Sequence, residues 1–208
     1  MSTHWITGKW SAAVLIAAGV GCSAAASEAD LTAALEREPT AESAAAFGSG
    51  ELGARFADGA VAGCLTAANK GEILQAEAVR DRLTDPAARR YAEAMVEMHT
   101  DALTTDKEAF AAAGIQALPS LGATVLTADS ALITKALVKA PEAKVDLVYA
   151  ESQVVVHGRV LFAIENELAP KARGEVTQAR LRAARDMVKA HLEEAKALYE
   201  TLKGNNAP

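Results

Sequence analysis

The chain is poor in the residues that disulfide frameworks, β-sheets and nucleic-acid interfaces require. Only two of its 208 residues are cysteine, and 4% are aromatic. Strands prefer β-branched and aromatic residues, whereas alanine, which is abundant here, has the highest helix propensity. The 21 basic and 27 acidic residues give a net charge of -6 without a basic cluster, so we expect no nucleic-acid partner. This composition favours an all-α protein.

The sequence signatures of several well-known sites are missing as well. The chain has no glycine-rich phosphate loop, no nucleophile-elbow pattern and no cysteine spacing typical of zinc. After the N-terminus, no stretch is apolar over the roughly 18 residues that a membrane span needs. About 50% of the residues are nonetheless hydrophobic, which is enough for one domain with a sizeable core.

The N-terminal stretch is typical of an export signal. Lys9 precedes a short apolar run that cannot span a bilayer but suits the core of a signal peptide. Residues 19–22 resemble a bacterial lipobox, with glycine where leucine is usual. We therefore predict a lipoprotein-type signal peptide at residues 1–21, lipidation of Cys22, and export to the periplasm or outer membrane with a lipid anchor in the membrane. Ordinary cleavage after Ala26, an uncleaved anchor and a misread start remain alternatives.

The stretch after the lipobox is predicted to be a flexible tether. Residues 22–53 are dominated by alanine, serine, glutamate, threonine and glycine, and they contain few large apolar side chains. If Cys22 is acylated, Cys64 remains as a lone thiol, which on a helix is most simply a small buried hydrophobe. The helical bundle is predicted to span residues 54–204.

The rest of the chain has the periodicity of long amphipathic helices. Asp85 can accept hydrogen bonds from first-turn amides and Pro86 suits the first helical position, so a helix begins here and runs to residue 113. Apolar residues at steps of three and four predict three further long helices and one shorter crossover. Their expected ranges are 61–83, 141–168 and 175–203, with the crossover at 119–140. This order predicts a ferritin-like four-helix bundle with a helical crossover between the second and third long helices.

Three histidines fall in the apolar stripes of these helices. His99, His157 and His191 lie one on each of the last three long helices, and Glu72 holds the matching position on the first. Glu72 precedes the turn at Asp85 by about as many residues as His99 follows it, so the two should face each other. All four side chains are expected near the middle of the bundle. Three imidazoles and a carboxylate suit zinc, copper, iron or manganese.

A conventional di-iron centre is not expected, because its Glu-x-x-His motif is absent. Valine occupies the third position before each histidine, and Glu151 is at best an outer neighbour of such a site. Two other interpretations stay open. The histidines and Glu72 form a buried hydrogen-bonded network with Tyr91 or Tyr149 that fixes helix register, or the histidines face solvent or a partner. Nearby methionines and arginines are interpreted as core packing and solvated helix faces: Met95, Met98, Met187, Arg180, Arg182 and Arg185.

Four short stretches carry a family resemblance. They are YAEAMVEMH at 91–99, VDLVY at 145–149, QVVVH at 153–157 and HLEEAK at 191–196. Over residues 61–202 the chain is similar to a bacterial domain of unknown function, found in exported proteins described as outer-membrane or periplasmic. The resemblance implies a ferritin-like fold and export, and it implies no reaction.

The leading interpretation is an exported cell-envelope lipoprotein with a ferritin-like bundle, without enzymatic activity or a required cofactor. Its molecular role and protein partner are not specified by the sequence. The alternative is a metal-binding or redox protein that holds a transition metal ion with His99, His157, His191 and Glu72. An interaction scaffold is a third class, which would need a large exposed apolar patch.

Overall fold

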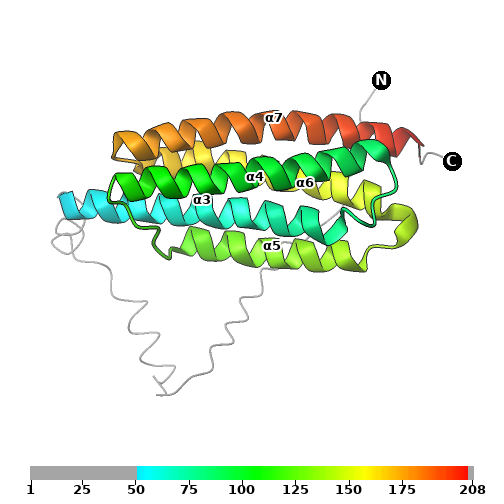
Figure 1. The fold of residues 1–208 in the computed structure, drawn as a ribbon, viewed down its shortest axis with the longest axis horizontal. Coiled ribbons are helices and arrows are strands. Elements are labelled where there is room, and N and C mark those ends of the chain that lie inside the picture. The colour runs from blue at the N-terminus through cyan, green and yellow to red at the C-terminus, as the bar shows by residue number, and fades with distance from the viewer. Residues whose placement is uncertain (1–50, 206–208) are drawn as a thin grey trace, which may run out of the picture. The chain divides into compact units, whose positions relative to one another are not determined.

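The computed structural model describes residues 51–205, which belong to the compact unit Ala41–Pro208. The predicted signal peptide, Cys22 and most of the predicted tether lie outside the described residues. Within residues 51–205 every regular element is helical (Figure 1), which confirms the all-α class. The elements are α3 (Glu51–Val79), α4 (Pro86–Ala112), α5 (Leu121–Lys139), η1 (Glu142–Lys144), α6 (Val145–Ala163), η2 (Ile164–Leu168), η3 (Ala169–Lys171) and α7 (Glu175–Asn205).

Several helix boundaries follow the local signals in the sequence. Asp85 accepts hydrogen bonds from two first-turn amides of α4, at 2.7 and 3.1 Å, and Pro86 is the first helical residue. Gly114 follows the end of α4 with a φ of 65°, a conformation that glycine adopts without a steric penalty. Other boundaries differ from the prediction: α3 already ends at Val79, and α6 begins only at Val145. Helix α3 begins earlier, at Glu51, and α7 continues through Gly204, because an exposed glycine in a last turn does not oblige a helix to end.

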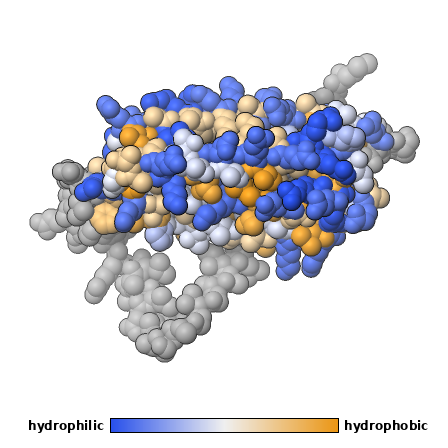
Figure 2. Space-filling view, in the orientation of Figure 1, coloured by the Kyte–Doolittle hydropathy of each residue, from blue (hydrophilic) through white to orange (hydrophobic). Residues whose placement is uncertain are grey.

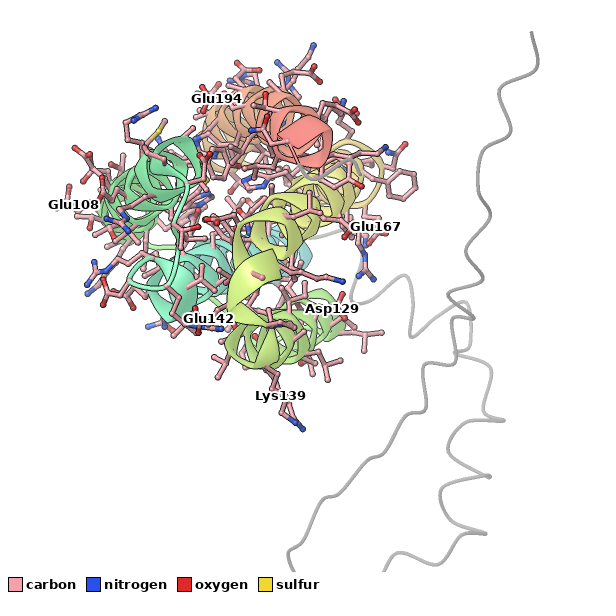
Figure 3. All side chains as sticks on the ribbon, turned by 90° about the vertical axis from the view of Figure 1, so that its right-hand side faces the viewer. Glu108, Asp129, Lys139, Glu142, Glu167 and Glu194 are labelled. Atoms are coloured by element: carbon pink, nitrogen blue, oxygen red, sulfur yellow. The ribbon has the colours of Figure 1, made fainter. Side chains whose placement is uncertain are left out.

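Helices α3, α4, α6 and α7 surround a common centre, and α5 lies outside them against α3 (Figures 1 and 3). Two aspartates join the helix ends. Asp146, in the first turn of α6, accepts hydrogen bonds from the amides of Thr84 and Asp85 at 2.9 and 3.1 Å. Asp58, near the start of α3, accepts the amides of Arg173 and Gly174 at 2.8 and 2.9 Å. The start of α6 is thereby fixed at one end of α3, and the start of α7 at the other.

The connection from α4 to α5 crosses the first turns of α3. The amide of Leu118 donates to the carbonyl of Gly59 at 2.8 Å. A Cβ atom at Gly63 would lie 2.1 Å from the Leu118 carbonyl oxygen, so only glycine permits this approach. At its other end α5 is held by Arg82, which donates to the carbonyls of Leu137 and Ala140 at 2.8 and 2.6 Å. These contacts place α5 alongside α3, running in the same direction.

The core consists of two apolar clusters with a polar layer between them. One cluster lies toward the α3–α4 turn and contains Leu83, Met95 and Tyr149. The other lies toward the opposite end and contains Val61, Phe110 and others. Between them are buried polar residues contributed by α3, α4, α6 and α7: Asn69, Glu72, Gln75, His99, Gln153, His157 and His191. The polar layer is therefore a central feature of the bundle.

The buried stripe of α6 differs from the predicted one. The three-four spacing of the sequence predicts a buried stripe of Leu147, Ala150, Val154, His157, Leu161, Ile164 and Leu168. Ala150, His157 and Ile164 are buried as predicted, but the four other members are only partly buried. Tyr149 and Val160, which lie outside the predicted stripe, are buried as well. Valine, leucine and isoleucine occur on several faces of this apolar helix, so spacing selected only some of the residues that face the core. A single π-helical turn begins at Ile164, and its extra residue rotates the following side chains about the helix axis relative to a regular α-helix.

Apolar side chains also remain on the surface, mostly on α5 and α6. Leu121, Leu132 and Phe162 are 82%, 66% and 60% exposed. Hydrophilic side chains predominate on the face drawn in Figure 2, with apolar ones in small groups between them. By length and composition alone, Leu121–Lys139 and Glu142–Lys171 are long and apolar enough to cross a membrane, so the expectation that no stretch after the N-terminus reaches that length is wrong by this measure. The second segment contributes to the core of the bundle, as apolar helices of soluble proteins do.

The shifted stripe predicts unequal costs for two neighbouring truncations. Ile164→Ala should lower the free energy of unfolding by about 2–5 kcal/mol, because it leaves a cavity among fully buried neighbours. Leu161→Ala, at a partly buried position, should cost clearly less. Urea denaturation of both variants measures the difference. A larger loss for Leu161→Ala would mean that the face of α6 is wrongly assigned.

Candidate metal centre

The three histidines meet at the centre of the polar layer. The ring centroids of His99 and His191 are 5.2 Å apart, those of His157 and His191 are 5.4 Å apart, and those of His99 and His157 are 5.9 Å apart. Each ring offers one nitrogen such that the three nitrogens all lie within 4.8 Å of one another. All three side chains are buried, with at most 2% of their surface exposed. The prediction that these residues converge near mid-bundle is therefore correct.

A chain of polar side chains orients His99. Its Nδ1 lies 2.9 Å from the side-chain oxygen of Asn69, which can only accept, so Nδ1 carries the proton. The Asn69 amide donates to Asp106 at 3.3 Å, and Asp106 accepts from Arg180 at 2.5 Å. His99 Nε2 is therefore the unprotonated nitrogen of this ring. It is buried and has no hydrogen-bond partner among residues 51–205.

The other two rings are oriented in the same way by different partners. His157 Nδ1 donates to the backbone carbonyl of Gln153 at 3.0 Å, which leaves Nε2 unprotonated. His191 Nε2 lies 3.3 Å from the thioether sulfur of Met98, a weak acceptor, which leaves Nδ1 unprotonated. Both free nitrogens are buried without a partner in the described part of the chain. Hydrogen bonding of the outer nitrogen is the usual way in which proteins orient a metal-binding histidine.

Glu72 lies beside this cluster and does not fully join it. A cavity of about 10 Å³ is lined by Glu72, His99 and His157. Glu72 is 3% exposed, and its Oε2 has no hydrogen-bond partner among the described residues. It is outside the group of ligand atoms that all lie within 4.8 Å of one another. The cavity between them is about large enough for one water-sized guest.

Burial keeps all four groups uncharged near neutral pH. Desolvation lowers the pKa of His157 from 6.5 to about 4, and desolvation together with His157 lowers the pKa of His191 to about 4. The pKa of His99 is also held well below its usual range, by burial and by the other two histidines. Burial raises the pKa of Glu72 from 4.5 to about 8, against an opposing hydrogen bond with Gln153. The three imidazoles are thus in the neutral form that binds metals.

The structure also corrects several predictions about the surroundings of the site. Arg180 does not belong to a solvated helix face, because it pairs with the buried Asp106. Met98 is not core packing, since it is 42% exposed and touches His191. Glu151 is exposed on the surface. Tyr91 donates to the backbone carbonyl of His191 at 3.2 Å and not to a histidine ring.

Asn69 and Asp106 were not assigned to the surroundings of the histidines from the sequence, because polar residues on a long helix are usually solvated. A sequence signal for them did exist. Asn69 precedes Glu72 by three residues, so the two share a face of α3. Asp106 follows His99 by seven residues, which places it two turns along the same face of α4. Polar residues on the same face as a core histidine are the positions where its outer hydrogen-bond partners are found.

The fold and the site together define an all-helical protein with a buried cluster of neutral histidines at its centre. The sequence profile of a domain of unknown function, DUF4142, matches residues 25–198, and the chain belongs to this family. The match confirms the resemblance to a family of domains of unknown function, and it begins inside the predicted tether. Neither the curated proteins nor the solved structures gave a match.

The buried groups predict that the metal-free chain is most stable near pH 6.5. On acidification, an unfolded histidine takes up a proton near its ordinary pKa of 6.5, whereas His157 and His191 have folded-state pKa values of about 4, so protons favour the unfolded chain. Above pH 6.5, folded Glu72 keeps its proton up to its pKa of about 8, while the unfolded residue is already ionised. Raising the pH to 8 should therefore cost about 2 kcal/mol of stability.

Chemical denaturation from pH 4 to 8 in the presence of a chelator measures how the free energy of unfolding falls on the acid flank and on the alkaline flank of pH 6.5. Glu72→Gln should remove the loss above pH 6.5 and leave the acid flank in place. An alkaline flank that persists in Glu72→Gln would show that another group is responsible.

Proposed function

We propose that the chain binds one transition metal ion through His99, His157, His191 and Glu72. The observation that carries the proposal is a set of four buried, unpartnered atoms from four different helices. They are Nε2 of His99 and His157, Nδ1 of His191 and Oε2 of Glu72. Leaving a buried polar atom unpaired costs about 1–3 kcal/mol, so three such nitrogens on neighbouring rings, with a carboxyl group beside them, need an explanation. A shared metal ion would satisfy all of them.

The spacing of the nitrogens supports a single ion. A tetrahedral site with bonds of about 2.0–2.1 Å holds its ligand atoms roughly 3.4 Å apart. One nitrogen of each ring lies within 4.8 Å of one nitrogen of the other two rings, so small side-chain rotations would bring three ligand atoms to one ion. A di-iron centre would need several carboxylates and the Glu-x-x-His motif. One carboxylate and three imidazoles suit a mononuclear zinc, copper, iron or manganese site.

The rival interpretation is a structural network that fixes helix register. Such a network is stable when its members satisfy one another, as buried polar groups normally do. Here each histidine uses one nitrogen for an outer partner and leaves the inner one unpaired. The outer hydrogen bonds can orient the rings, but they do not account for the inner nitrogens. This imbalance favours a ligand over a purely architectural role.

We also infer that the helices form a ferritin-like bundle. The support is their order: an α3–α4 hairpin, a long connection that contains α5, and then α6 packed on α7. In such bundles metal sites are built at the centre from side chains on facing helices. The position of the polar layer between two apolar clusters agrees with that arrangement.

Metal analysis of the chain without its predicted signal peptide and lipidation site tests the metal proposal. The protein from residue 23 onward, purified without a histidine tag, should bind about one equivalent of metal after incubation with zinc, copper, iron or manganese. His157→Ala should lose it, because a ligand is removed. Asn69→Ala should keep the ion with about 10- to 100-fold weaker affinity, since only the support of His99 is removed. Folded protein that takes up none of the four metals would disprove the proposal.

We propose that the chain is exported and anchored to a bacterial envelope membrane through a lipid on Cys22. The support is the short apolar run after Lys9 and the small residue before Cys22. In this proposal the mature chain begins at Cys22, and residues 23–50 connect the lipid to α3. The metal centre would then work in the periplasm or at the outer membrane.

Mass spectrometry of the protein expressed in a bacterium checks the anchor. The expected mature N-terminus is acylated Cys22, and Cys22→Ser should release the protein from the membrane fraction or leave it unprocessed. Cys64→Ser serves as the matched control and should not change fractionation, since Cys64 is buried in α3. A mature N-terminus at residue 27, after Ala26, would show plain secretion instead.

A further inference from the structure

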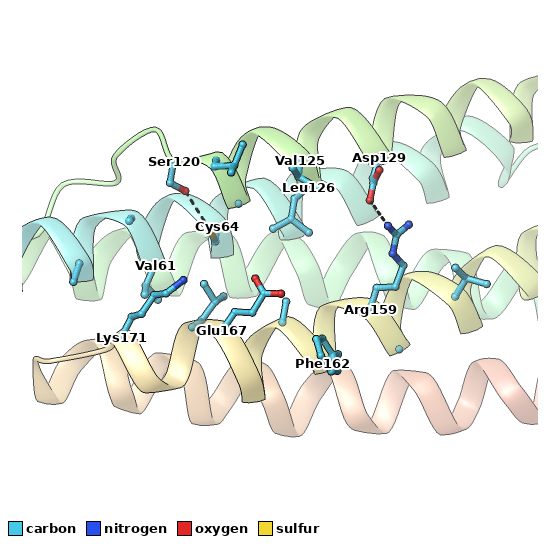
Figure 4. Close-up of a pocket in the computed structure, with 18 residues that line it drawn as sticks. Val61, Cys64, Ser120, Val125, Leu126, Asp129, Arg159, Phe162, Glu167 and Lys171 are labelled. Carbon is cyan, nitrogen blue, oxygen red and sulfur yellow. Dashed lines mark hydrogen bonds and ion pairs between the residues drawn. The ribbon is translucent and has the colours of Figure 1, made fainter. Parts of the chain in front are cut away.

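A groove between α5 and α6 forms the outer end of a series of cavities that leads to the histidines. The groove has a volume of about 770 Å³, and its floor is α3 (Figure 4). Asp129 of α5 and Arg159 of α6 face each other across it, with a 3.0 Å ion pair. Their side chains are 33% and 63% exposed. The pair is thus accessible from solvent at this point.

A second, smaller cavity lies behind this ion pair. Its volume is about 30 Å³, and Asp129, Arg159 and Leu126 line both it and the groove. Its other walls include the polar residues Glu72, Gln75 and Ser130. Gln75 donates to Ser130 at 3.5 Å, and Ser130 donates to the carbonyl of Gly71 at 3.3 Å. A few polar side chains therefore lie among the mostly apolar walls of this cavity.

The second cavity shares walls with the cavity at the metal centre. Glu72, Ala68 and Val160 line both of them. The inner cavity is also lined by His99 and His157. Each of the three cavities thus shares lining residues with the next, from the groove, past Asp129 and Glu72, to the histidines. Asp129 offers a carboxylate, the type of group that attracts a hydrated cation, at the outer step. Glu72 offers a protonated carboxyl group at the inner step, and it would release its proton to solvent on binding the metal.

We infer that metal ions enter the centre through this route, with the Asp129–Arg159 pair as its gate. The inference rests on the proposed function, because an entry route for metal ions requires that the histidines and Glu72 bind a metal. Arg159 competes with an arriving cation for Asp129, so the ion pair must open before a cation can pass. Glu72, which lines both inner cavities, is the first metal ligand that the ion meets.

The position of α5 suits such a gate. Ser130 and Leu137 are its buried residues, and most of the helix is exposed. Because α5 packs closely along α3 and only lightly against α6, opening is expected on the side of α5 that faces α6. An outward movement of α5 would widen the second cavity without disturbing α4 or α7, which hold His99 and His191.

The test is the rate at which the mature chain takes up Co²⁺, followed by its visible absorption in a stopped-flow instrument. Arg159→Ala removes the gate and should speed uptake and release severalfold, with the Co²⁺ affinity nearly unchanged. Asp129→Asn should slow uptake by roughly three- to tenfold, because it removes an attracting charge. Ser130→Leu should slow uptake and release together by filling the second cavity. Circular dichroism shows whether this last variant is folded, and the two exposed variants test the route independently of it.

Matched controls come from the same groove. Lys171→Ala and Glu167→Gln change charge as Arg159→Ala and Asp129→Asn do, but neither residue lines the second cavity. Their uptake rates should equal that of the unmodified chain. Equal rates in all variants, or the same changes in the controls, would overturn the route while leaving Co²⁺ binding intact. Absence of Co²⁺ binding to every variant and to the unmodified chain would instead count against the metal centre.

Discussion

The bundle depends on the burial of three imidazoles and one carboxyl group between two apolar clusters. Four helices each contribute one of these groups, so the layer joins all of the long helices at one level. Burial keeps the groups uncharged, and that neutrality is what makes it possible to place them side by side. Their inner lone pairs remain unpaired, which is a cost to the metal-free chain and a source of affinity for a ligand.

Hydrogen bonds from neighbouring groups orient the three imidazole rings of this layer. Asn69, the Gln153 carbonyl and the Met98 sulfur each engage one nitrogen of one ring. The other nitrogen of each ring is then the one without a proton. A chain from Asn69 through Asp106 to Arg180 continues this support to the edge of the bundle. The site is thus built from main-chain, amide and thioether groups as well as from the histidines themselves.

Helix α5 links the centre to the surface. The close approach of Leu118 to Gly63 places the connection against α3, and Arg82 holds the far end of α5. This position brings Ser130 and Asp129 to the side of the polar layer, where they line a cavity with Glu72. The crossover therefore does more than connect two hairpins, because it forms one wall of the proposed route to the metal centre.

The order of residues along each helix was enough to predict the helices and the three histidines that meet at the centre. Helix periodicity and capping are local properties, so Asp85, Pro86 and the spacing around His99, His157 and His191 were sufficient. Packing between the helices was needed to establish the remaining buried residues of α6, the pairing of Asp106 with Arg180, the separate position of Glu72 and the series of cavities. Those features depend on how each helix is rotated about its axis and on which distant side chains fill the remaining space. Neither is set by the order of residues within one helix.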